Sequence, residues 1–142
     1  MIGLDTNVLV RYITQDDAKQ SAKASRLIEA LAADDPAFVP LVTLVELVWV
    51  LSGAYGFERD DIAAVIEQLL RSRELIVDRS DLVLQARRRY QAGGADFADC
   101  LIERIAHDAG CATTMTFDSK AAKSAHMTLV EQSRTRRESA LR

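Results

Sequence analysis

Short apolar runs alternate with helix-like segments along almost the whole chain, and this alternation limits the folds open to it. The apolar runs predict strands at residues 2–4, 38–39, 75–77, 111–117 and 127–130. Helical periodicity and stop signals predict helices at 8–13, 18–33, 43–51, 60–71, 80–92, 96–109 and 118–125. Strands that alternate with helices predict a parallel sheet covered on both faces, so we expect an α/β fold.

The composition is that of a globular protein without an obvious targeting or membrane segment. The chain has 142 residues, of which 49% are hydrophobic and 27% charged, enough to bury a core in one domain. Cys100 and Cys111 are too few for a disulfide framework and have no Cys–His metal spacing. The longest apolar stretch, 41–51, is too short to span a bilayer. We expect a cytoplasmic protein with no membrane association.

Charge is divided unevenly between the body and the C-terminal end. The net charge of −3 combines −6 over residues 1–131 with +3 over residues 132–142. We therefore expect a single domain over 1–131 and a basic, flexible tail over 132–142. An acidic body argues against a simple DNA-binding module, but it is compatible with an enzyme that holds cations in an acidic pocket.

Two aspartates directly follow predicted strands. Asp5 comes after the first strand, and Asp118 comes after the strand at 111–117. Ligand sites of open α/β sheets lie outside the carboxyl ends of the strands, which makes both side chains candidate site residues. Each could instead cap the helix that follows, and for either residue alone this is the simpler explanation.

Glu46 lies in a helical segment that is apolar on nearly every side. Such a helix is expected to be buried, and an unpaired buried carboxylate is costly. The run Thr43-Leu-Val-Glu46 also matches a capping box, which would explain the glutamate without any function. The segment alone leaves both interpretations open.

The helix at 96–109 carries two further aspartates. Its predicted buried arc contains Ala98, Leu101, Ile102, Ile105 and Ala109. Asp99 falls on the shoulder of this arc and is expected to face inward, whereas Asp96 is expected to cap the helix. Glu103 and His107 are expected on a solvated face.

Asp5, Glu46, Asp99 and Asp118 are predicted to lie near one edge of the sheet. Only Lys120 is close in sequence to any of them. Carboxylates gathered in this way must take up protons or bind cations. Oxygen donors without thiolates favour Mg²⁺ or Mn²⁺.

Four sequence motifs resemble those of PIN-domain nucleases. They are Ile2-Gly-Leu-Asp5-Thr6-Asn7-Val8-Leu9, Val42-Thr43-Leu-Val-Glu46-Leu47, Phe97-Ala-Asp99-Cys-Leu-Ile102 and Thr114-Met-Thr116-Phe-Asp118. They occur in order and span most of the chain. Within that family, the sequence resembles the VapC-type toxins of bacterial type II toxin–antitoxin systems.

The resemblance implies a three-layer α/β/α fold with a parallel sheet of about five strands. It also implies a Mg²⁺- or Mn²⁺-dependent endoribonuclease that hydrolyses RNA by metal-activated water and leaves 5′-phosphate and 3′-hydroxyl ends. Asp5, Glu46, Asp99 and Asp118 would form the acidic quartet, with Asp5 and Asp99 as direct metal ligands. Thr6, Asn7 and Thr116 would be polar support, and Asp96 is either a fifth carboxylate or a cap. A small antitoxin and a homodimer are the implied protein partners.

RNA has to reach an acidic pocket, so flanking cations are needed. Candidates are Arg11, Lys120, Lys123, the arginines of the tail and Arg87–Arg89, although the last three more simply form a solvated helix face. A structured RNA such as tRNA would suit the site. Trp49, Tyr55 and Phe57 are expected in the core, with a partner-binding cluster as the alternative.

Three other functions compete with this interpretation. A receiver-type phosphotransfer domain fits poorly, because Asp16-Asp17 follows a helix and lies too far from Asp5. A catalytically silent PIN scaffold that only binds RNA or a protein is disfavoured by the four carboxylates. Cleavage of DNA rather than RNA is not distinguished by the sequence.

Overall fold

Three of the expected strands pair in parallel. In the computed structural model, which describes residues 1–130, strand β1 (Ile2–Gly3) pairs with β2 (Ala37–Val39), and β2 pairs with β3 (Leu75–Val77). Ile2 lies opposite Ala37, and Ala37 lies opposite Leu75. The carboxyl ends of all three strands therefore meet at one edge.

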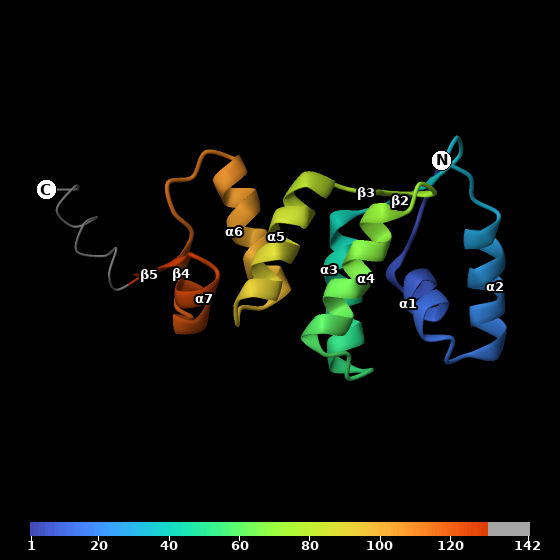
Figure 1. Cartoon of the computed structure of the whole chain (residues 1–142), viewed down its shortest axis with the longest axis horizontal. Helices are drawn as coiled ribbons and strands as arrows, with labels where there is room; N and C mark the ends of the chain where they lie inside the picture. Colours follow the sequence, from blue (N-terminus) through green and yellow to red (C-terminus); the bar gives the residue numbers. More distant parts are fainter. Residues whose placement is uncertain (131–142) are drawn as a thin grey trace, which may run out of the picture. The chain divides into compact units, whose positions relative to one another are not determined.

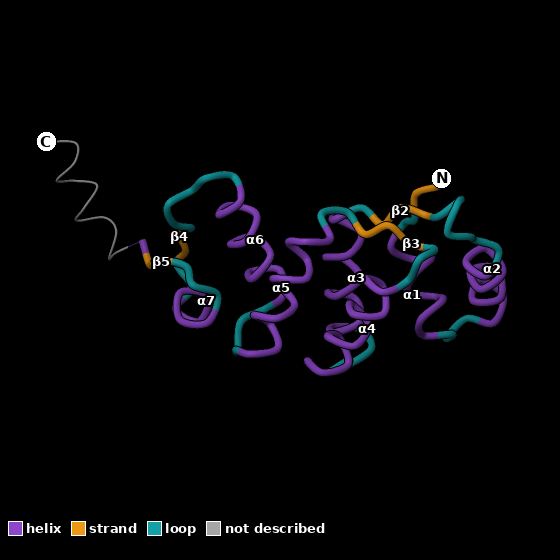
Figure 2. Tube along the Cα trace, turned by 45° about the horizontal axis from the view of Figure 1, so that its top comes forward, coloured by secondary structure: helices purple, strands orange, loops and turns teal. Residues whose placement is uncertain are grey.

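Helices connect these strands in the predicted order. Between β1 and β2 come α1 (Thr6–Thr14) and α2 (Ala18–Glu29), and between β2 and β3 come α3 (Leu41–Gly53) and α4 (Arg59–Arg71). Figures 1 and 2 show α1 beside α2 and α3 beside α4, as their contacts require. Leu9, Val39, Leu47 and Ile62 are fully buried and belong to the core of this part of the chain. The parallel, alternating order confirms the α/β prediction.

The remaining elements form a second compact unit. The chain divides into Met1–Ser80 and the part from Asp81 onward, and we describe each by itself. The second unit holds α5 (Ser80–Ala92), α6 (Phe97–Asp108), β4 (Met115–Thr116), α7 (Ser119–Ser124) and β5 (Thr128–Leu129). Strands β4 and β5 pair in parallel, so the described residues contain five strands, three in one sheet and two in another.

Aromatic packing joins α5 to α6. The rings of Tyr90 and Phe97 meet edge to face with centroids 5.9 Å apart, and both side chains are buried. The expected buried arc of α6 was partly wrong: Phe97, Cys100 and Leu101 are buried, but Ile102 is 51% exposed.

The predicted tail at 132–142 lies outside the described residues, as does residue 131. Across residues 1–130, no helix combines the length and the apolar character that a membrane span requires.

Candidate active site

Asp5 lies beyond the carboxyl end of β1 and is the N-cap residue of α1. Its carboxylate accepts a hydrogen bond of 2.8 Å from the backbone amide of Thr6, so the capping interpretation is correct as geometry. The side chain is exposed and keeps acceptor capacity for other partners. The Thr6 hydroxyl is buried and has no hydrogen-bond partner among the described residues. Two consecutive residues therefore carry an oriented carboxylate, on Asp5, and a hydroxyl without a partner among the described residues, on Thr6.

Helix α3 reaches the same edge of the sheet. The Thr43 hydroxyl is buried and donates a hydrogen bond of 3.0 Å to the carbonyl oxygen of Leu4, the residue before Asp5. Glu46 lies about one turn further along α3. The first unit therefore brings the helix of Glu46 to the end of the strand that carries Asp5.

The capping-box interpretation of Glu46 is wrong. Helix α3 begins at Leu41 with Pro40 as its N-cap, so Thr43 is already inside the helix. The expected burial is also wrong, because Glu46 is exposed. Glu46 is therefore not part of a capping box, and its place in the metal site stays a prediction.

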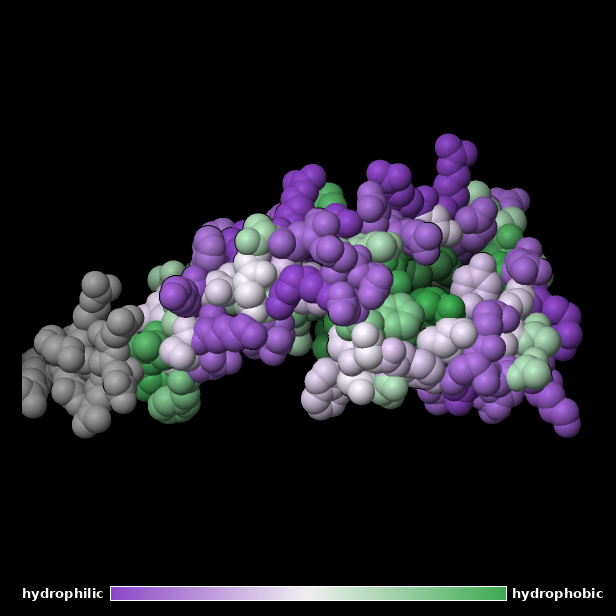
Figure 3. Space-filling view, turned by 60° about the horizontal axis from the view of Figure 1, so that its bottom comes forward, coloured by the Kyte–Doolittle hydropathy of each residue, from purple (hydrophilic) through white to green (hydrophobic). Residues whose placement is uncertain are grey.

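The apolar surroundings of Glu46 are partly at the surface as well. Trp49 is 81% exposed and Val42 is 69% exposed, so the expected core position of Trp49 is wrong. Figure 3 shows that hydrophobic side chains reach the surface of this unit among hydrophilic ones.

In the second unit, the charges of two aspartates act on a third. Asp99, half-buried in the first turn of α6, has its pKa raised by burial and then by the negative charges of Asp96 and Asp118. Lys120 opposes this effect. Asp96 is the N-cap residue of α6, but its carboxylate makes no capping hydrogen bond. The capping role expected for Asp96 is therefore confirmed for its backbone and not for its side chain.

Asp118 is fixed by its local backbone. Its amide donates a hydrogen bond of 3.0 Å to the Thr116 hydroxyl, and its carboxylate accepts one of 2.8 Å from the amide of Lys120. Asp118 is thus the N-cap of α7, and Thr116 supports the turn that presents it. The side chain is exposed.

The donors fit a hard divalent cation in chemistry: all are carboxylates, and Asp99 is repelled by two of them. Within residues 1–130, however, no three acidic, histidine or cysteine side chains are grouped closely enough to hold an ion. Asp5 and Glu46 belong to the first unit, and Asp96, Asp99 and Asp118 belong to the second.

Two expectations about charged residues outside this set were wrong. Glu103 is only 7% exposed, not solvated, and it pairs with Arg89 and Arg104. Arg89 is therefore engaged in the protein and does not belong to a solvated face of arginines.

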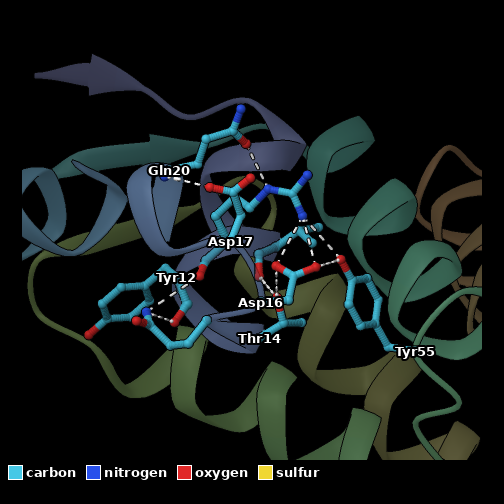
Figure 4. A network of polar contacts seen from close by, with 9 residues as sticks. Tyr12, Thr14, Asp16, Asp17, Gln20 and Tyr55 are labelled. Carbon is cyan, nitrogen blue, oxygen red and sulfur yellow. Dashed lines mark hydrogen bonds and ion pairs between the residues drawn. The ribbon is translucent and has the colours of Figure 1, made fainter. Parts of the chain in front are cut away.

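The sequence analysis also missed a polar network in the first unit. Arg11 pairs with Asp16 at 3.0 Å, and the Tyr55 hydroxyl contacts both side chains (Figure 4). The available signal was the polar stretch Thr14-Gln-Asp16 at the C-terminal end of α1, but the partner Tyr55 is 39 residues away from Asp16 in sequence.

Comparison with known proteins identifies the family. The PIN domain matches residues 2–126, on both sides of the boundary at Ser80. A protein of Aquifex aeolicus (strain VF5), described as a VapC ribonuclease, is 28% identical over 114 residues, which cover 80% of this chain and 84% of the relative. The chain belongs to the PIN-domain family.

Proposed function

We propose that this chain is a metal-dependent endoribonuclease and the toxin of a toxin–antitoxin pair, acting in the cytoplasm. The observation that carries the proposal is the set of aspartates in the second unit. Asp99 is half-buried and repelled by Asp96 and Asp118, a charge arrangement that a divalent cation would relieve. The family match and the similarity to a VapC ribonuclease support the same activity.

Asp5, Glu46, Asp99 and Asp118 would hold the cation, either Mg²⁺ or Mn²⁺, with Asp96 as a fifth carboxylate. When bound, such an ion lowers the pKa of water and neutralises charge on a phosphate. The backbone amide of Thr6 and the N-cap position orient Asp5, and the amide of Lys120 orients Asp118. Carboxylates held in this way need little reorganisation before they bind.

The test is cleavage of total RNA by the purified chain with Mg²⁺, Mn²⁺ or EDTA. We expect discrete fragments that require metal and carry 5′-phosphates. Asp5→Asn and Asp99→Asn should each reduce cleavage at least about 100-fold, since even outer partners of a metal site can cost that much. Asp34→Asn, which changes an exposed carboxylate in a turn, is the matched control and should cleave normally. Fragments ending in 2′,3′-cyclic phosphate would rule out this chemistry.

The toxin role has a separate test. Induced expression should arrest growth, the Asp99→Asn variant should not, and a small protein from the neighbouring reading frame should restore growth. RNA binding without any metal-dependent cleavage would instead favour the silent scaffold. Size determination of the purified chain should show a homodimer.

A further inference from the structure

A pocket of about 350 Å³ opens between α1 and α2 in the first unit. Its polar lining consists of Asn7, Arg11, Gln20 and Lys23. Asn7 is the second residue after Asp5 and lies in the first turn of α1. The pocket therefore adjoins the turn that presents one of the candidate metal ligands.

Arg11 is held rigidly in this pocket. Its Nε donates a hydrogen bond of 2.7 Å to Gln20, and its Nη1 donates to both carboxylate oxygens of Asp16 at 3.0 Å and to Tyr55 at 3.1 Å. Tyr55 and Thr14 also donate to Asp16, which lowers the pKa of this carboxyl to about 2 and keeps the anchor charged. Figure 4 shows Gln20, Asp16 and Tyr55 around the guanidinium. A guanidinium fixed in advance loses little entropy when a ligand binds.

Lys23 supplies a second positive charge. It is exposed on α2, and no residue within 1–130 forms an ion pair or hydrogen bond with its ammonium group. Asp16 offsets part of the charge of Arg11, whereas no described residue pairs with Lys23, so Lys23 is expected to be the stronger of the two phosphate contacts.

The remaining wall is apolar. Val8 and Leu27 line the pocket, and Leu27 is 40% exposed. Two cations beside an aliphatic surface suit a group that combines a phosphate with a flat, weakly polar ring. A nucleotide has this chemistry, since basic side chains contact its phosphate and apolar side chains cover its base.

We propose that this pocket binds one nucleotide of the RNA substrate next to the cleaved bond, with its phosphate at Lys23 and Arg11 and its base against Leu27. The proposal rests on the proposed nuclease function. Residues 1–131 carry a net charge of −6 and the candidate ligands are carboxylates, so a polyanionic substrate needs local cations beside Asp5.

The test is equilibrium binding of a short fluorescent single-stranded RNA in EDTA, over a series of salt concentrations. Lys23→Ala should weaken binding about fivefold, the effect of a net loss of roughly 1 kcal/mol. It should also reduce the slope of log K against log salt by about 0.7, the value for one phosphate contact on a single strand. Leu27→Ala should weaken binding without changing the slope.

Lys19→Ala is the matched control. Lys19 is exposed on the same helix and does not line the pocket, so the variant loses the same charge but should bind RNA normally. Equal weakening by Lys19→Ala and Lys23→Ala would overturn the proposal. So would unchanged RNA binding by Lys23→Ala, including the case in which only binding of a protein partner is lost.

A parallel cleavage assay with the unmodified chain separates the two proposals. RNA cleavage together with a normal Lys23→Ala affinity would overturn the subsite and keep the nuclease. A Lys23→Ala effect on binding with no cleavage under Mg²⁺ or Mn²⁺ would overturn the nuclease and keep the RNA subsite. Circular dichroism of each variant checks that the fold is retained.

Discussion

At the scale of single residues, Asp99 is the candidate site residue whose negative charge is expected to oppose folding. Burial and its acidic neighbours raise its pKa, so the folded state binds a proton more tightly than the unfolded chain does. At pH values above its folded pKa, the charged side chain therefore opposes folding. Asp99→Asn removes this penalty and should raise the melting temperature near neutral pH in EDTA.

The gain from Asp99→Asn should shrink on acidification and vanish near the unfolded pKa of aspartate, about 3.9. Thermal unfolding of the unmodified chain and of Asp99→Asn across this pH range measures the difference in melting temperature and its direction. A lower melting temperature for Asp99→Asn near neutral pH, or a gain that grows in acid, would contradict the charge arrangement. Asp34→Asn serves again as the control, because its carboxylate is exposed in a turn.

The pKa of Glu103 is shifted in the opposite direction from that of Asp99. Burial opposes ionisation, but hydrogen bonds from Arg104 and Arg89 outweigh it and lower the pKa of this carboxyl. Arg104 binds both carboxylate oxygens, at 2.8 and 3.0 Å. Glu103→Gln should lower the free energy of unfolding by about 2 kcal/mol, as for other hydrogen bonds to charged groups.

This stabilisation should be complete above the unfolded pKa of glutamate, about 4.3, and be lost as the pH falls toward the lower folded pKa. Urea unfolding at several pH values measures it. Glu67→Gln is the matched control, because Glu67 forms an exposed i,i+4 pair with Arg71 and should change stability by less than about 0.5 kcal/mol. Equal effects of the two substitutions would show that Glu103 contributes no more than a surface pair.

Residue-scale expectations from the sequence succeeded where the cause was local. The caps at Asp5 and Asp118 follow from the strand that ends before each residue, and both were expected. Burial of Glu103 depends on Arg89, 14 residues away on another helix, and an i,i+4 rule along α6 cannot reveal it. The quartet itself remains a prediction.

At the scale of elements, the sequence could not predict where α3 begins, because the start of this helix depends on a residue far away in the chain. The expected helix began at Thr43, but Pro40 has φ −58° and forms the N-cap, and the amide of Leu41 donates to the Asp78 carboxylate at 3.2 Å. Asp78 follows β3, so this partner exists only once the parallel sheet has formed. By contrast, β3 and α5 have the predicted bounds, because Ser80 and Gly93 give clear local start and stop signals.

The contact between α3 and β1 gives the prediction at this scale. Thr43→Val keeps the shape of the side chain but removes the hydroxyl that bonds to the buried carbonyl of Leu4. An unsatisfied buried acceptor should lower the free energy of unfolding by about 2 kcal/mol. Thr43→Ser restores the hydroxyl and should recover most of the loss in chemical denaturation. An unchanged stability of Thr43→Val would show that the hydrogen bond contributes nothing, and an equal loss in Thr43→Ser would show that the methyl group contributes as much as the hydroxyl.

At the scale of the whole molecule, the family match runs from residue 2 to residue 126, through the boundary between the two compact units at Ser80. We propose on this basis that both units belong to one PIN domain and unfold together, as small single domains usually do. Two probes can test this. Trp49, the only tryptophan, reports on the first unit, and a dye on the exposed thiol of Cys111 reports on the second.

Denaturant midpoints from the two probes should coincide, and the isolated segment 1–80 should fail to fold. The reason is that residues 81–126 of the matched family domain would be missing from this segment, together with the core around Tyr90 and Phe97. Cys100 is buried, so the label should react with Cys111 alone, and Cys111→Ser provides the unlabelled control. Two separated midpoints, with a folded 1–80 segment, would show two independent domains. The carboxylates Asp5 and Glu46 would then belong to a different folding unit from Asp99 and Asp118, and a single shared metal site would lose its structural basis.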